Sequence, residues 1–89
     1  MASEIDKILK ADKEKLLVKG FKETLKAAKL GNISNIYIAK TCPDVMKRKL
    51  QEVAELAKIK LIELPLTAEE LSAQLKKPFN ITVLAISSK

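Results

Sequence analysis

The chain has 89 residues, of which 17 are Lys or Arg and 11 are Asp or Glu, and its net charge is +6. This length allows one domain, spanning residues 1–89, with a modest core, and the basic balance favours a polyanionic partner such as nucleic acid or an anionic lipid surface. A single Cys excludes an internal disulfide and a Cys-rich metal site, and one Tyr, two Phe and no Trp argue against a mechanism based on stacking bases on aromatic side chains.

The first third of the chain predicts a helix, a strand and a second helix. Ser3 is a typical N-cap residue, and the apolar residues after it recur with helical spacing to about Ala11. The short apolar run Lys15–Lys19 is expected to be a strand that Gly20 ends. Phe21–Leu30 then has a helical apolar pattern, and the glycine after it is a typical helix stop.

The middle of the chain predicts a strand, a long helix and a third strand. Ile33–Lys40 is rich in β-branched and aromatic residues, which is typical of a buried strand. Pro43 stands at a first helical position and opens a helix to about Lys58. Ile59–Leu64 is expected to be the third strand. The apolar positions expected on the long helix are Val45, Met46, Leu50, Val53, Ala54 and Leu56.

The last third predicts a helix and a final strand. Thr67-Ala-Glu-Glu70 has the spacing of a capping box, and the helix that it opens should run to about Leu75. Pro78 interrupts the chain before the apolar run Phe79–Ile86, which is expected to be the fourth strand. Strict alternation of helices and strands implies helices on both faces of the sheet, and therefore an α/β/α sandwich.

The first group of candidate binding residues surrounds the turn into the second helix. Gly20 permits a sharp turn and a close approach of a ligand to the backbone. Phe21 opens the helix, and Lys22, Glu23 and Lys26 lie on one side of its first two turns. Lysines can pair with phosphates, and a carboxylate can accept from base amino groups. On composition alone, an ordinary solvated helix start explains these residues better.

The second group surrounds the start of the long helix. Thr41, Cys42 and Pro43 precede a helix whose first amides are free to bind an anion, and a Lys-Arg-Lys run follows one turn later. The three cations are Lys47, Arg48 and Lys49. A charged outer helix face is the simpler interpretation of that run. A nucleophilic role for the cysteine is not expected, because the chain contains no His to act as its base.

A third candidate group is the basic turn Lys76-Lys77-Pro78-Phe79, which would complete a three-loop surface if the sheet order places it beside the other two loops. Its alternative is a solvated turn whose Phe79 fills the core. No Gly-rich phosphate loop, His or paired carboxylates are present, so we expect no enzyme activity, cofactor, metal or small-molecule substrate. No apolar run approaches the roughly 20 residues of a membrane span, and no signal peptide opens the chain, which favours a cytoplasmic location.

The segments G-F-K-E-T-L-K-A-A-K-L-G and T-C-P-D-V-M-K-R-K, separated by a strand, resemble the ribosomal protein superfamily that binds kink-turn RNA. This superfamily has L-seven-a-e, L-thirty-e, S-twelve-e and Gadd branches. The chain is most similar to the L-thirty-e branch of archaeal and eukaryotic large subunits. The resemblance extends from about Ser3 to Ser87 and includes the K-P-F turn with the strand after it.

This resemblance implies a three-layer α/β/α sandwich around a four-stranded mixed sheet, with an RNA surface built from three loops at one end. It implies a ribosome-associated RNA-binding protein whose partners are ribosomal RNA and neighbouring ribosomal proteins. A scaffold or regulatory protein of the same fold, which binds proteins instead, is the alternative. Ser72 and Lys76 stand where relatives favour glycine, so the third loop should be less adapted to gripping an extruded base. The RNA-contact residues expected are Gly20, Phe21, Lys22, Glu23, Lys26, Thr41, Cys42, Pro43, Lys47, Arg48, Lys76, Lys77 and Pro78.

Overall fold

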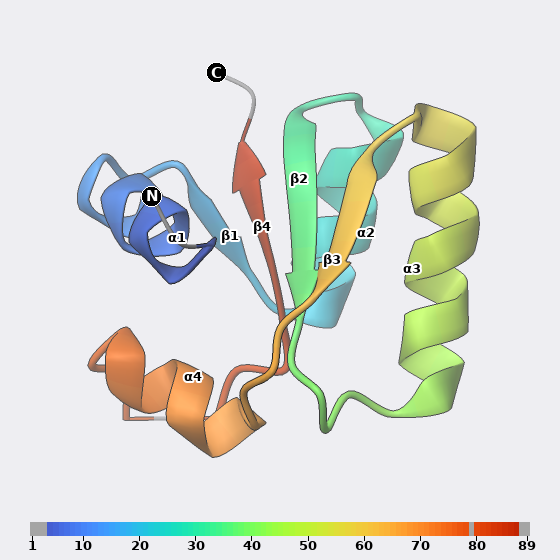
Figure 1. Cartoon of the computed structure of the whole chain (residues 1–89). Helices are drawn as coiled ribbons and strands as arrows, with labels where there is room; N and C mark the ends of the chain where they lie inside the picture. The colour runs from blue at the N-terminus through green and yellow to red at the C-terminus, as the bar shows by residue number, and fades with distance from the viewer. Residues whose placement is uncertain (1–3, 79, 88–89) are drawn as a thin grey trace.

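The computed structural model describes residues 4–78 and 80–87, in which helices and strands alternate along the chain (Figure 1). The predicted cap at Ser3 and the predicted core position of Phe79 lie outside these residues. The elements are α1 (Glu4–Lys13), β1 (Leu17–Lys19), α2 (Phe21–Lys29), β2 (Ile33–Ile38), α3 (Asp44–Ala57), β3 (Lys60–Glu63), α4 (Ala68–Gln74) and β4 (Val83–Ser87).

The four strands form one mixed sheet in the order β1-β4-β2-β3. The last strand of the chain lies inside the sheet, antiparallel to both β1 and β2, while β2 and β3 are parallel. Its residues Val83, Leu84 and Ala85 are fully buried, as expected for a strand covered on both faces. This order brings the end of β1, the end of β2 and the beginning of β4 to the same edge of the sheet.

Two helices cover each face of the sheet, which confirms the predicted α/β/α sandwich (Figure 1). On one face, α1 and α4 pack over a cluster that includes Ile8, Tyr37, Leu71 and Leu84. On the other face, α2 and α3 pack over a separate cluster that includes Ile36, Ile38, Ala28, Leu50 and Val83. Adjacent residues of β2 and β4 thus contribute to opposite clusters, because side chains alternate between the two faces of a strand.

The first strand is shorter than predicted because α1 continues to Lys13, beyond the expected end at Ala11. Lys15 has a positive φ of 60° and belongs to the turn that closes the helix. The Leu16 amide donates to the Ala11 carbonyl at 2.8 Å in the same turn. The extended pairing therefore begins only at Leu17.

The last strand also begins later than predicted. Residues 80–82 are a loop, and regular pairing starts at Val83. The apolar residue Ile81 in this loop is buried in the core, which explains why the sequence pattern there resembles a strand. The other predicted boundaries differ from the observed ones by one or two residues.

Two of the six apolar residues expected on α3 are not part of its buried face. Val45 is 81% exposed and Leu56 is 87% exposed, whereas Leu50 and Ala54 are buried against the sheet. An apolar residue type alone does not identify the buried face of a helix, since some apolar side chains also remain on protein surfaces.

Candidate nucleic-acid interface

Three segments that are distant in sequence meet at one edge of the sheet. The Gly20 amide donates to the Val83 carbonyl at 2.9 Å, and the Ala39 amide donates to the Thr82 carbonyl at 2.8 Å. The loop at residues 80–82 is therefore held between the turn into α2 and the segment that leads to α3. In Figure 1 this edge is at the bottom of the sheet, where α2 and α3 begin.

The starts of α2 and α3 lack side-chain caps. Gly20 is the N-cap of α2, with a φ of 99°, a backbone conformation that favours glycine. Pro43 is the N-cap of α3, one position earlier in the helix than expected, and it also provides no side-chain hydrogen bond. The first amides of both helices are consequently open to an external acceptor, and the helix dipoles favour an anion there.

The start of α4 is different because it is capped within the chain. The Thr67 hydroxyl accepts from the Glu70 amide at 3.1 Å, and the Glu70 carboxylate accepts from the Thr67 amide at 2.9 Å. This confirms the predicted capping box. The hydrogen bonds to Thr67 lower the pKa of the Glu70 carboxyl. Only two of the three helix starts near this edge therefore keep amides available for a ligand.

The charged residues of the first group are all on the surface of α2. Lys22, Glu23 and Lys26 are exposed, and none makes an ion pair with another described residue. Phe21, by contrast, is partly buried and packs against the core below α2 and α3. The lysines are thus free to pair with a ligand phosphate, while Phe21 holds the helix start against the sheet.

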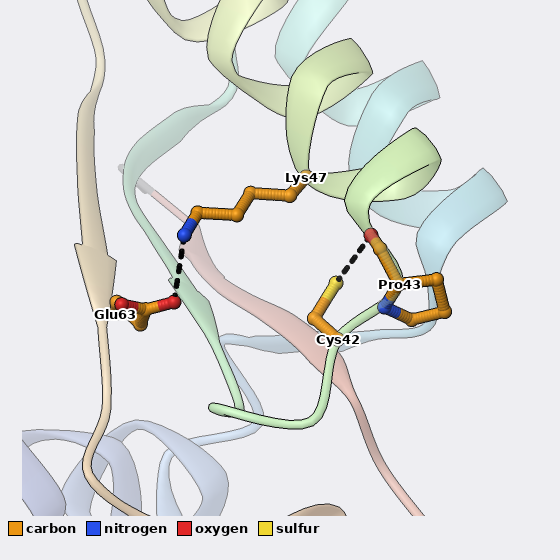
Figure 2. A network of polar contacts seen from close by, with 4 residues as sticks. All are labelled: Cys42, Pro43, Lys47 and Glu63. Carbon is orange, nitrogen blue, oxygen red and sulfur yellow. Dashed lines mark hydrogen bonds and ion pairs between the residues drawn. The ribbon is translucent and has the colours of Figure 1, made fainter.

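The second group is divided by a salt bridge, shown in Figure 2. Lys47 Nζ lies 2.8 Å from a carboxylate oxygen of Glu63, the last residue of strand β3. This hydrogen bond raises the pKa of Lys47, and the Glu63 carboxylate places a negative charge directly beside the ammonium group. Arg48 and Lys49 are exposed and have no ion-pair partner in the described part of the chain. The available cations of this helix are therefore Arg48 and Lys49 rather than Lys47.

The loop before α3 has mainly structural contacts. The Thr41 hydroxyl accepts from the Ala68 amide at 3.0 Å and so connects this loop to the start of α4. The Cys42 thiol is half-buried and donates a weak hydrogen bond to the Pro43 carbonyl, with a sulfur–oxygen distance of 3.7 Å (Figure 2). Burial raises the pKa of the Cys42 thiol, with Lys47 opposing this effect. A thiol with a raised pKa is a poor nucleophile at neutral pH.

The basic turn of the third group lies on the α1 and α4 side of the sheet, whereas α2 and α3 lie on the other side (Figure 1). It follows the C-terminal end of α4, which points away from the starts of α2 and α3 (Figure 1). Lys77 Nζ lies 3.7 Å from the Asp12 carboxylate of α1, and Lys19 Nζ lies 3.5 Å from the same oxygen. The return segment 80–82, rather than the lysines themselves, is the part of this loop that lies between the other two.

Ser72 and Lys76 are the two positions at which the sequence resemblance predicts glycine. Lys76 has a positive φ of 56°, a conformation in which glycine is the least strained residue. The buried Ser72 hydroxyl donates to the Ala68 carbonyl at 2.8 Å and accepts from the Ile81 amide at 2.6 Å. A side chain that glycine lacks thus fixes the return segment to α4.

Sequence reasoning missed Asp12 and Ser72 as residues that position the third loop. The partners of Asp12 are in other elements, so no local motif could reveal them. Ser72 was noted only as a replacement of glycine.

In residues 4–78 and 80–87, no group of three or more acidic, Cys or His residues is arranged to hold a metal ion. No helix within these ranges is both long and apolar enough to cross a membrane.

Comparison with protein families matches residues 3–89 to the ribosomal protein L7Ae/L30e/S12e/Gadd45 family. Among individual relatives, a protein of Aeropyrum pernix named large ribosomal subunit protein eL30 is 36% identical over 67 residues, which cover 75% of this chain and 67% of the relative. A protein of Methanosarcina mazei with the same name is 32% identical over 87 residues, covering 97% of this chain and 81% of the relative.

Solved structures share the fold at lower sequence identity. A protein of unknown function from Bacillus halodurans superimposes with a TM-score of 0.88 at 16% identity, covering 99% of this chain and 87% of that one. A Giardia lamblia 15.5 kD RNA-binding protein superimposes with a TM-score of 0.83 at 15% identity, covering 96% and 71% of the two chains. These similarities support the arrangement of strands and helices described above.

Proposed function

Because the chain belongs to the ribosomal protein L7Ae/L30e/S12e/Gadd45 family, we propose that it is an RNA-binding protein of the large ribosomal subunit that holds bent, kink-turn-like ribosomal RNA. Two relatives that carry the name of a large-subunit protein support the ribosomal role. The family also supports a structural rather than an enzymatic role. The same family had been expected from the G-F-K-E-T and T-C-P-D segments, and the family comparison confirms it.

One observation carries the proposal: two helix starts without side-chain caps open at the same edge of the sheet. The hydrogen bonds of Gly20 and Ala39 to the segment before β4 hold these starts side by side. A sharply bent RNA brings phosphates of different segments close together. Two adjacent anion sites at fixed spacing suit such a backbone better than a straight duplex.

The proposed contacts divide into backbone and side-chain groups. The amides at the starts of α2 and α3 donate to phosphate oxygens, and Gly20 lets the RNA backbone approach closely. Lys22, Lys26 and Arg48 add charge-assisted contacts from exposed positions. Glu23 would accept a hydrogen bond from a base amino group. Further proposed contacts are Phe21, Thr41, Cys42, Pro43, Lys47, Lys76, Lys77 and Pro78.

The deciding experiment is co-sedimentation of the tagged protein with ribosomal subunits in its own cells, followed by crosslinking to identify the RNA. We expect the protein in the large-subunit fraction, crosslinked to bent ribosomal RNA. A variant in which Lys22, Lys26 and Arg48 are all changed to Ala tests the proposed contacts. It should no longer sediment with the large subunit. A protein that sediments alone and crosslinks only to other proteins would favour the scaffold alternative instead.

A further inference from the structure

Two lysines from distant parts of the chain converge on one carboxylate on the α1 and α4 side of the sheet. Lys19, the last residue of β1, places its Nζ 3.5 Å from Oδ1 of Asp12. Lys77 places its Nζ 3.7 Å from the same oxygen. The two ammonium nitrogens are therefore no farther apart than the sum of these distances, which is within reach of a single phosphate group. Of the two lysines, only Lys77 belongs to the proposed RNA contacts.

The three side chains are more restricted than the exposed lysines of α2. Their relative exposure is 30% for Lys19, 28% for Lys77 and 25% for Asp12. A long side chain that is already restricted loses less conformational entropy when it binds a ligand. The two ammonium groups are thus held close together in advance, while both side chains still reach solvent.

The ion pairs with Asp12 leave both cations able to bind a further anion. They are longer than the 2.8 Å hydrogen bond from Lys47 to Glu63. Two ammonium groups share a single carboxylate, and no second acidic side chain in the described part of the chain pairs with either of them, so the cluster keeps a net charge of +1. Each ammonium group has three donors and can contact a carboxylate and a phosphate together.

The cluster adjoins the proposed RNA surface. Lys19 directly precedes Gly20, the N-cap of α2. The Gly20 amide donates to the carbonyl of Val83, where the loop after α4 enters β4, and Lys77 lies in the first part of that loop. The two lysines therefore lie next to the open start of α2, but on the side of the sheet that α1 and α4 cover (Figure 1).

We propose that Lys19 and Lys77 form a phosphate-binding pair for a second segment of the bent RNA, and that Asp12 is the positioning residue that holds the pair together. This inference rests on the proposed function, because it takes bent RNA as the ligand. The starts of α2 and α3 contact one segment of the backbone, and the lysine pair contacts another segment across the edge of the sheet. A bent backbone reaches both places at once, whereas a straight duplex does not, so the pair favours bent RNA.

The test measures the affinity of the full chain for a consensus kink-turn RNA, and for a duplex of equal length, over a range of salt concentrations. Lys19→Ala combined with Lys77→Ala should weaken kink-turn binding about tenfold or more, because charge-assisted hydrogen bonds are lost. The log–log salt slope should become shallower by about two units. Lys10→Ala combined with Lys29→Ala is the matched control, since it removes the same charge from two exposed lysines outside the cluster. It should leave both quantities nearly unchanged.

Asp12→Asn separates positioning from simple charge. The substitution makes the chain more positive, so electrostatic attraction alone predicts tighter binding of both RNAs. Loss of positioning predicts instead that the preference for the kink-turn over the duplex falls severalfold. Asp12→Glu keeps a carboxylate at this place and should restore most of the preference.

The outcomes distinguish this inference from the proposed function. If the double change at Lys19 and Lys77 leaves kink-turn binding intact while Lys22→Ala weakens it, the inference is overturned and the proposed function stands. If the unchanged protein binds neither RNA, both are overturned. Equal tightening of both RNAs by Asp12→Asn would overturn the positioning role, because the carboxylate would then only reduce the positive charge.

Discussion

The Ile81 amide donates a 2.6 Å hydrogen bond to the buried Ser72 hydroxyl, and this contact ties the loop before β4 to α4. Ser72→Ala removes the acceptor and leaves a buried amide unsatisfied, which typically costs about 1–3 kcal/mol. We therefore expect urea unfolding to show a loss of stability of that size. Ser34→Ala is the control, because the Ser34 hydroxyl bonds to the Ile86 carbonyl at an exposed position and should matter little.

Thr24 provides the opposite case, because its buried hydroxyl has no hydrogen-bond partner among the described residues. Thr24→Val replaces the hydroxyl by a methyl group of similar size and removes the cost of burying an unsatisfied polar atom. We expect the variant to be more stable than the parent by about 1 kcal/mol. A lower melting temperature of Thr24→Val would mean that the hydroxyl has a partner or a bound water.

The exposed lysines of α2 should contribute to RNA binding without contributing to folding. Lys22→Ala and Lys26→Ala should weaken RNA affinity in a filter-binding assay while changing stability by no more than about 0.5 kcal/mol. Lys29→Ala is the matched control for Lys22→Ala, since Lys29 is an exposed lysine at the last position of the same helix. Ile38→Ala should behave in the reverse way, with a loss of about 2–5 kcal/mol of stability from a core cavity. Normal RNA binding by both lysine variants would place the RNA surface elsewhere.

RNA affinity should fall steeply with salt concentration, because each phosphate that a lysine or arginine neutralises releases counterions. A few such contacts predict a log–log slope of roughly −2 to −5. Each lysine that contacts a phosphate should make the slope shallower by about one unit when it is changed to Ala. A slope near zero for the unchanged protein would exclude the electrostatic mechanism.

Discrimination between RNAs should be modest. Ser72 and Lys76 stand where the resemblance to kink-turn-binding proteins predicts glycine, and the structure shows Ser72 fixing the loop and Lys76 at a positive φ. We expect the protein to bind a consensus kink-turn better than a duplex of equal length by about 1–2 kcal/mol, the scale of one good base contact. Competition between the two RNAs at one salt concentration measures this difference. A preference of a thousandfold or more would show that the chain recognises kink-turns without those glycines.

Local patterns in the chain predicted most of the fold. The capping box at Thr67, the glycine stops at Gly20 and Gly31 and the β-branched run of β2 each act within a few residues, so they can be recognised without the rest of the molecule. Alternation of helices and strands was sufficient to predict the three layers. The same local signals placed Lys22 and Lys26 on the second helix and Arg48 on the third, where the structure leaves them exposed.

The tertiary structure decided what depends on pairing between distant segments. The position of β4 between β1 and β2 brings the loop at residues 80–82 between the two open helix starts. Pairing across elements also directs Lys47 to Glu63 and Lys77 to Asp12, and these pairings reduce the charge available from two predicted contacts. The exposure of Val45 and Leu56 follows from how α3 is rotated on the sheet. Contacts of this kind join residues that are remote along the chain, so their geometry is set only when the whole sheet and both helical layers are packed.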